Sequence, residues 1–80
     1  MRLDKYLKVS RIIKRRTVAN DACDGGRVEV NGKTAKASYE VKVGDVIVLS
    51  FGARQVKVRV TEINEYVKKE QAGSMYEIIE

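Results

Sequence analysis

Cationic side chains dominate the first sixteen residues, MRLDKYLKVSRIIKRR. Only Asp4 is acidic, and the seven cations are Arg2, Lys5, Lys8, Arg11, Lys14, Arg15 and Arg16. Lysine and arginine bind phosphate through charge, and arginine adds a planar fork of N–H donors that fits phosphate oxygens. Apolar residues lie between these cations at spacings that would anchor the segment to a hydrophobic core. A disordered basic tail would not need such apolar residues. The segment therefore points to RNA or DNA as the partner.

The net charge of +5 is unevenly distributed. Residues 1–42 hold eleven Lys or Arg against five Asp or Glu, whereas residues 43–80 hold five against six. A lysine-rich solvated surface is the alternative explanation, but the unevenness and the share of arginine argue against it. The first half of the chain is therefore the half expected to meet nucleic acid.

The residue types that carry most catalytic and metal-binding chemistry are scarce. The chain has no histidine and one cysteine, Cys23, so neither an intrachain disulfide nor a Cys–His metal site is expected. No carboxylate pair or activated nucleophile is evident. The longest uncharged stretch, residues 46–53, is far shorter than the roughly 20 apolar residues that span a bilayer, and no secretory signal follows the basic start. We expect a cytoplasmic, non-enzymatic protein without cofactor, metal or membrane partner.

The first expected element that positions the cations is a short helix over about residues 3–9. Leu3, Tyr6 and Leu7 follow the i, i+3, i+4 spacing of one buried helical face. Tyr6 could stack on a base, but its phase with the two leucines favours the core. Residues 10–16 are expected to form a connector, and Asp4 is expected to orient a neighbouring cation or to cap the helix.

A second helix is expected to follow the connector. Thr17 is predicted to be its N-cap, with Asp21 near its positive end, and Gly25-Gly26 is predicted to end it. Its predicted buried face consists of Val18, Ala19, Ala22 and Cys23.

Beyond the glycines the apolar period changes to two, which is typical of strands. Residues 27–30 alternate, and Asn31-Gly32 is a strong two-residue turn signal. Strands are also predicted over 46–51 and around 56–61, with a last edge strand over 75–79.

These elements predict an α+β fold in which two short N-terminal helices pack on a small antiparallel sheet. Eighty residues allow one domain. We expect an RNA-binding domain over 1–64 and a short C-terminal segment over 65–80. The polar stretch 64–73 is expected to be a loop or a frayed turn.

Many of these residues together resemble the S4 RNA-binding domain. The matching strings are RLDK-x-L at 2–7, Arg11, RT-x-A at 16–19, GRV-x-VNG at 26–32, Lys36 and VGD at 43–45. The resemblance implies the αL motif, two helices followed by a small sheet, and implies that the helical face binds structured RNA through backbone and shape. The expected RNA-binding residues are the seven N-terminal cations, with Lys33 and Lys36 as a further contact.

Residues 68–76 resemble the end of two stand-alone families, heat-shock protein 15 and RqcP (also called YabO). Heat-shock members usually carry a further basic C-terminal extension that the printed chain lacks, and the IKRRT string at 13–17 also favours RqcP. We expect a non-catalytic monomer. The resemblance to RqcP implies a factor that binds rRNA and P-site tRNA on obstructed large ribosomal subunits. It would assist C-terminal tailing of stalled chains beside a nascent-chain elongation factor.

Three alternatives remain open at this stage. The first is heat-shock-type recycling of free large subunits that carry a nascent chain. The second is an enzyme, because S4 domains often accompany pseudouridine synthases and tyrosyl-tRNA synthetases as an appendage. The third is a protein–protein adaptor that docks a partner on the sheet or on residues 64–73. Tyr39, Tyr66 and Tyr76 show no pattern of an aromatic platform for single strands.

Overall fold

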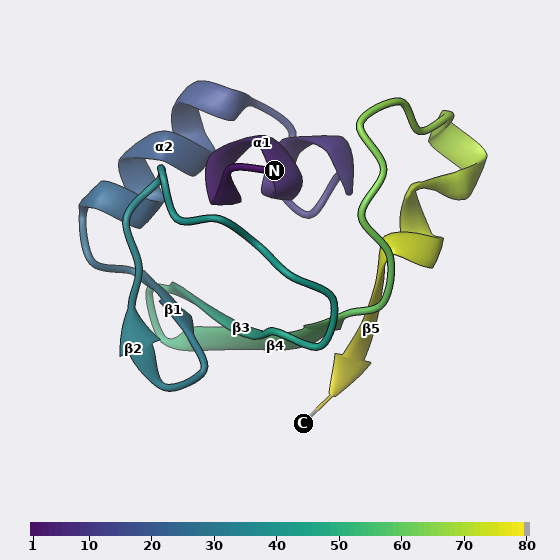
Figure 1. The fold of residues 1–80 in the computed structure, drawn as a ribbon. Coiled ribbons are helices and arrows are strands. Elements are labelled where there is room, and N and C mark those ends of the chain that lie inside the picture. Colours follow the sequence, from purple (N-terminus) through teal and green to yellow (C-terminus); the bar gives the residue numbers. More distant parts are fainter. Residues whose placement is uncertain (80) are drawn as a thin grey trace.

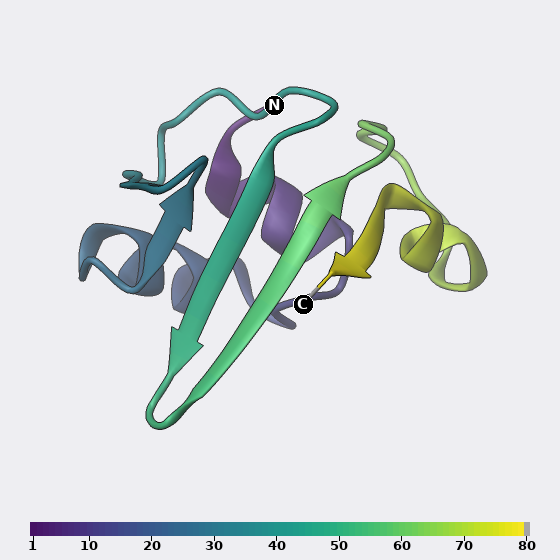
Figure 2. The same cartoon turned by 90° about the horizontal axis from the view of Figure 1, so that it is seen from below.

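The computed structural model describes residues 1–79. A five-stranded antiparallel sheet forms one layer, and helices α1 and α2 cover one of its faces (Figures 1 and 2). The elements are α1 (Leu3–Val9), α2 (Arg16–Asp24), β1 (Val28–Val30), β2 (Lys33–Thr34), β3 (Val46–Phe51), β4 (Arg54–Val60), the 3₁₀ helix η1 (Lys69–Met75) and β5 (Tyr76–Ile79). The strand order is β2-β1-β3-β4-β5. The predicted α+β fold is confirmed.

Helix α1 has the predicted bounds and the predicted buried face. Leu3, Tyr6 and Leu7 are fully buried. The helix ends where Arg11 adopts a left-handed conformation, with φ of 64°, and its backbone N–H donates to the carbonyl of Lys8. This turn returns Ile13 to the core although it is out of phase with the helix, and the Ile13 N–H donates to the Leu7 carbonyl at 3.0 Å.

Helix α2 begins earlier than predicted, which corrects three expectations. Its N-cap is Arg15, whose side chain makes no capping hydrogen bond, so the prediction of Thr17 as the cap was wrong. Asp21 consequently lies in the sixth helical position rather than near the positive end. Val18 is 46% exposed and not buried, because it is one residue out of phase with the buried stripe.

The remaining predicted face of α2 is correct: Ala19, Ala22 and Cys23 are buried at i, i+3, i+4 spacing. The glycine stop is also correct. The Gly25 N–H donates to the carbonyl of Asp21 at 2.8 Å, and Gly26 takes the left-handed conformation with φ of 80°.

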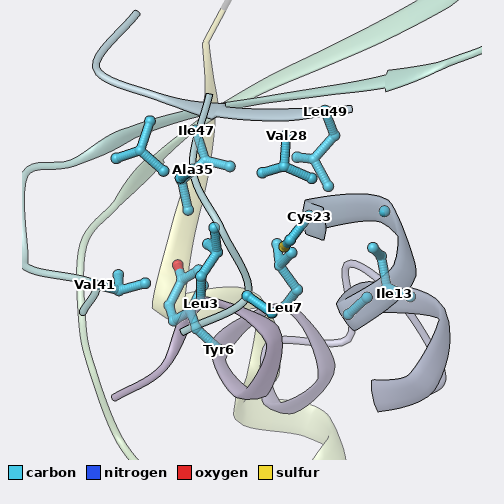
Figure 3. Close-up of a cluster of buried hydrophobic side chains, with 14 of the residues drawn as sticks. Leu3, Tyr6, Leu7, Ile13, Cys23, Val28, Ala35, Val41, Ile47 and Leu49 are labelled. Atoms are coloured by element: carbon cyan, nitrogen blue, oxygen red, sulfur yellow. The ribbon is translucent and has the colours of Figure 1, made fainter. Parts of the chain in front are cut away.

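The sheet is built on the predicted alternation. Positive φ at both Asn31 and Gly32 closes a two-residue hairpin. The second strand of this hairpin, β2, has only two residues, so the sequence shows no alternating pattern that would have predicted it. On β3 and β4 every second side chain enters the core, and the four buried ones are Ile47, Leu49, Val58 and Val60. Figure 3 shows strand side chains such as Ile47 and Leu49 above Leu3, Tyr6 and Leu7 of α1, with Cys23 of α2 beside them.

The C-terminal segment is tied to α1 through the carbonyl of Met75. That oxygen accepts the Tyr6 hydroxyl at 2.7 Å and the backbone N–H groups of Thr61 and Glu62 at 2.9 and 3.2 Å. Burial raises the pKa of Tyr6 far above its ordinary value, so the phenol remains a donor. The predicted loop at 64–73 contains the start of η1, and β5 forms the predicted edge strand on β4.

Candidate RNA-binding site

The carboxylate of Asp4 organises the start of the helical face. Its side chain is 3% exposed, whereas those of Arg2 and Arg16 are each 49% exposed. Arg2 donates from Nε to Oδ1 at 3.2 Å, and Arg16 donates from Nε to Oδ2 at 3.4 Å. One buried carboxylate therefore holds two half-exposed guanidinium groups side by side.

Two further groups donate hydrogen bonds to the Asp4 carboxylate. The Asn20 amide donates to Oδ2 at 3.2 Å, and the Lys5 backbone N–H donates to Oδ1 at 2.8 Å. Burial raises the pKa of Asp4, but the hydrogen bonds from Asn20, Arg2, Arg16 and the Lys5 backbone outweigh it, so the pKa lies below the ordinary 3.8. Asp4 therefore stays ionised at neutral pH and keeps both arginines in place.

The arginines retain donors for an anion. Nε of Arg16 is used by Asp4, and among residues 1–79 its two Nη groups have no hydrogen-bond partner. The first turn of α2 contains no acidic residue and no side-chain cap, so the free N–H groups at this helix start add to the positive potential. Arg15 and Arg16, both predicted RNA-binding residues, lie at this end of α2.

The other N-terminal cations divide into two groups. Nζ of Lys5 forms an ion pair with Glu65 at 2.9 Å, and this lysine lowers the pKa of Glu65. Lys5 is therefore directed toward the C-terminal segment. Lys8, Arg11 and Lys14 are exposed and line a common cavity of about 390 Å³ at the other end of α1.

Lys33 and Lys36 line a separate cavity of about 690 Å³. The segment after β2 passes α1, because the Ala37 carbonyl accepts the backbone N–H of Asp4 at 3.2 Å. Lys36 thus directly precedes the residue that contacts Asp4, whereas Lys33 lies on the edge strand β2. Buried Asp45 accepts hydrogen bonds from the Tyr39 hydroxyl at 3.1 Å and the Lys42 N–H at 2.9 Å and so orders this segment.

Asn20 is the site residue that the sequence analysis missed. It lies one turn after Arg16 on α2, and a cavity of about 310 Å³ is lined by Asp4, Arg16, Thr17, Asn20 and Asp21. The i, i+4 spacing of Arg16 and Asn20 places them on one helical face. The sequence shows this spacing, but it does not show that both side chains bind Asp4 on α1.

Among residues 1–79 no group of His, Cys, Asp and Glu could hold a metal ion. Cys23 is fully buried, and burial raises the pKa of its thiol to about 11, so it is not an activated nucleophile. Within the same residues, no helix is long and apolar enough to cross a membrane.

Residues 1–47 match the family model described as the S4 domain. The chain belongs to the S4 domain family. This S4 domain protein is 57% identical over 79 residues to the "RQC P-site tRNA stabilizing factor" of Streptococcus pneumoniae, which covers 99% of this chain and 90% of the relative. It is 53% identical over 79 residues to the Bacillus subtilis factor of the same name, covering 99% of this chain and 92% of the relative.

The solved structure of Vibrio cholerae heat shock protein 15, described as trimeric, superimposes on this S4 domain protein with a TM-score of 0.90. Its identity is 31%, and the match covers 99% of this chain and 81% of that one. The predicted resemblance to small stand-alone S4 proteins is confirmed. The relatives named for ribosome quality control have the higher identity, as the sequence analysis expected.

Proposed function

We propose that this S4 domain protein binds rRNA and P-site tRNA on obstructed large ribosomal subunits and assists the C-terminal tailing of stalled nascent chains. The observation that carries the proposal is full-length identity of 53–57% to relatives whose name describes stabilisation of P-site tRNA. The pair Arg2 and Arg16 also supports the proposal. Both guanidinium groups are oriented by hydrogen bonds to Asp4, so they can bind phosphates that a folded RNA holds at a fixed spacing.

The proposal also covers the partners and the absence of catalysis. The protein acts in the cytoplasm as a non-catalytic monomer, without cofactor, beside the factor that elongates the stalled chain. Its RNA-binding residues are the nine predicted cations, with Arg2 and Arg16 as the central pair. Specificity comes from RNA shape, since exposed side chains for reading bases are few on this face.

Heat-shock-type recycling of free subunits remains the second candidate function, favoured by the TM-score of 0.90 to heat shock protein 15. In both functions the helical face binds the large ribosomal subunit. They differ in whether P-site tRNA contributes to the binding surface.

Purified large subunits with and without P-site tRNA separate these functions. We expect the protein to bind the tRNA-carrying subunits about tenfold or more tightly, because tRNA phosphates add contacts. Filter binding at one fixed salt concentration measures both affinities. Equal affinity for the two particles would contradict the tRNA-stabilising function and favour the heat-shock role.

A further inference from the structure

Residues 61–75 form a loop that is fastened beside the C-terminal end of α1 (Figure 1). Its two ends meet where the Met75 carbonyl accepts the N–H groups of Thr61 and Glu62, and where the Thr61 hydroxyl donates to the Ser74 carbonyl at 2.8 Å. The Tyr6 hydroxyl attaches the same Met75 carbonyl to α1. Ala72 and Met75 are buried. The loop is therefore held in one place relative to α1.

The loop places Lys68 and Lys69 next to cations of the helical region. Lys69 lines the cavity of about 390 Å³ with Lys8, Arg11 and Lys14. Lys68 lines a second cavity, of about 440 Å³, to which Lys8 and Arg11 also contribute. The two cavities thus share Lys8 and Arg11.

These cations lack neutralising partners within residues 1–79. None of the five forms an ion pair there. Glu65, the one acidic residue that lines either hollow, is paired with Lys5 at 2.9 Å. Like charges at close range repel one another, so an external anion would relieve this repulsion.

The backbone fixes where Arg11 leaves the helix. Its left-handed conformation, with φ of 64°, ends α1. Its N–H donates to the Lys8 carbonyl at 3.0 Å, so Arg11 is held next to Lys8. Arg11 is also the residue, with Lys8, that both hollows share.

We propose that Lys68 and Lys69, together with Lys8, Arg11 and Lys14, form a second basic patch that binds the phosphodiester backbone of RNA. The proposal rests on the proposed RNA-binding function and extends the contact surface to the C-terminal loop. Helix α1 has seven residues and is therefore about 10 Å long. Asp4 lies in the first turn of α1 and Lys8 in the last, about 6 Å apart along the axis. The second basic patch and the pair Arg2 and Arg16 therefore lie at opposite ends of α1 and contact different phosphates of one folded RNA.

The test uses the charge reversal Lys68→Glu/Lys69→Glu in the full chain. Both side chains are exposed, so we expect the fold to persist, as checked by circular dichroism and thermal unfolding. Affinity is measured against salt for three probes: a labelled RNA hairpin, empty large subunits, and large subunits carrying P-site tRNA. We expect affinity to fall about tenfold or more at about 0.1 M salt, and the slope of log K against log salt to become shallower by about 1.8.

The matched control is Arg54→Glu/Lys57→Glu, the same charge change on exposed residues of β4. This control removes the general effect of net charge. A loss confined to the tRNA-carrying subunits identifies tRNA as the source of the phosphates, and a loss on both particles identifies rRNA. Equal losses for the loop variant and the control, or no loss on any probe, would overturn the proposal. Failure of the wild-type protein to bind either particle would refute the proposed function, while the hairpin still tests the second basic patch.

Discussion

Arg16→Ala is expected to weaken binding to large ribosomal subunits by about tenfold or more. Arg16 is the first residue of α2, where the backbone N–H groups have no side-chain cap, and Asp4 fixes the orientation of its guanidinium group through Nε. Alanine removes both the charge and the planar donors. Arg2→Ala should have a similar effect, because Arg2 occupies the other side of the same carboxylate. Binding titrations against salt should also show a slope shallower by about 1 for each variant.

The matched control for this prediction is Arg54→Ala. It removes the same exposed charge from β4, on the sheet rather than on the helical face, and should leave affinity within about twofold. The Arg16 side chain is half exposed, so its loss should change the free energy of unfolding by less than about 1 kcal/mol. Normal binding by a folded Arg16→Ala protein would show that RNA is bound elsewhere.

Asp4→Asn is expected to weaken RNA binding although it makes the protein more positive. If charge alone governed affinity, removing a carboxylate from a basic face would strengthen binding. The structure predicts the opposite, because a neutral amide in place of the carboxylate would lose both ion pairs that hold Arg2 and Arg16. We expect affinity to fall about fivefold or more, measured by the same titration. Unchanged or tighter binding would show that the arginines need no positioning by Asp4.

The same substitution should lower stability by about 1 to 2 kcal/mol at neutral pH. The pKa of Asp4 is lower in the folded protein than its ordinary 3.8, so folding favours the ionised form. Its contribution is therefore present above pH 3.8 and is lost as the pH falls through the folded-state pKa. Urea unfolding should show the wild type approaching the variant in stability as the solution is acidified. A difference that does not change with pH would contradict this role of the carboxylate.

Local spacing predicted much of the fold. The i, i+3, i+4 pattern gave α1 its bounds and its buried face, and Asn31-Gly32 gave the hairpin. The start of α2 was mispredicted because Thr17 is a good cap by composition, whereas the helix begins at Arg16 without any side-chain cap. Composition alone does not reveal a helix that begins without a side-chain cap.

The site was predictable as a set of cations but not as a geometry. Arg2 and Arg16 were predicted as RNA-binding residues because they are cationic. Asp4 was expected to orient a neighbouring cation, and its two ion pairs confirm this. Arg2 lies only two residues from Asp4, but the contact of Arg16 with the same carboxylate depends on how α2 packs against α1. The same holds for Lys5, whose partner Glu65 lies sixty residues away in the chain.

A sucrose-gradient profile of the tagged protein from its own cells tests the central claim most directly. Each fraction is probed for the protein, for large-subunit rRNA and for tRNA. We predict that the protein co-migrates with large subunits that still hold tRNA, and that Arg16→Ala shifts it to the top of the gradient. Migration of the wild-type protein at the top, or with small subunits, would contradict the proposed function.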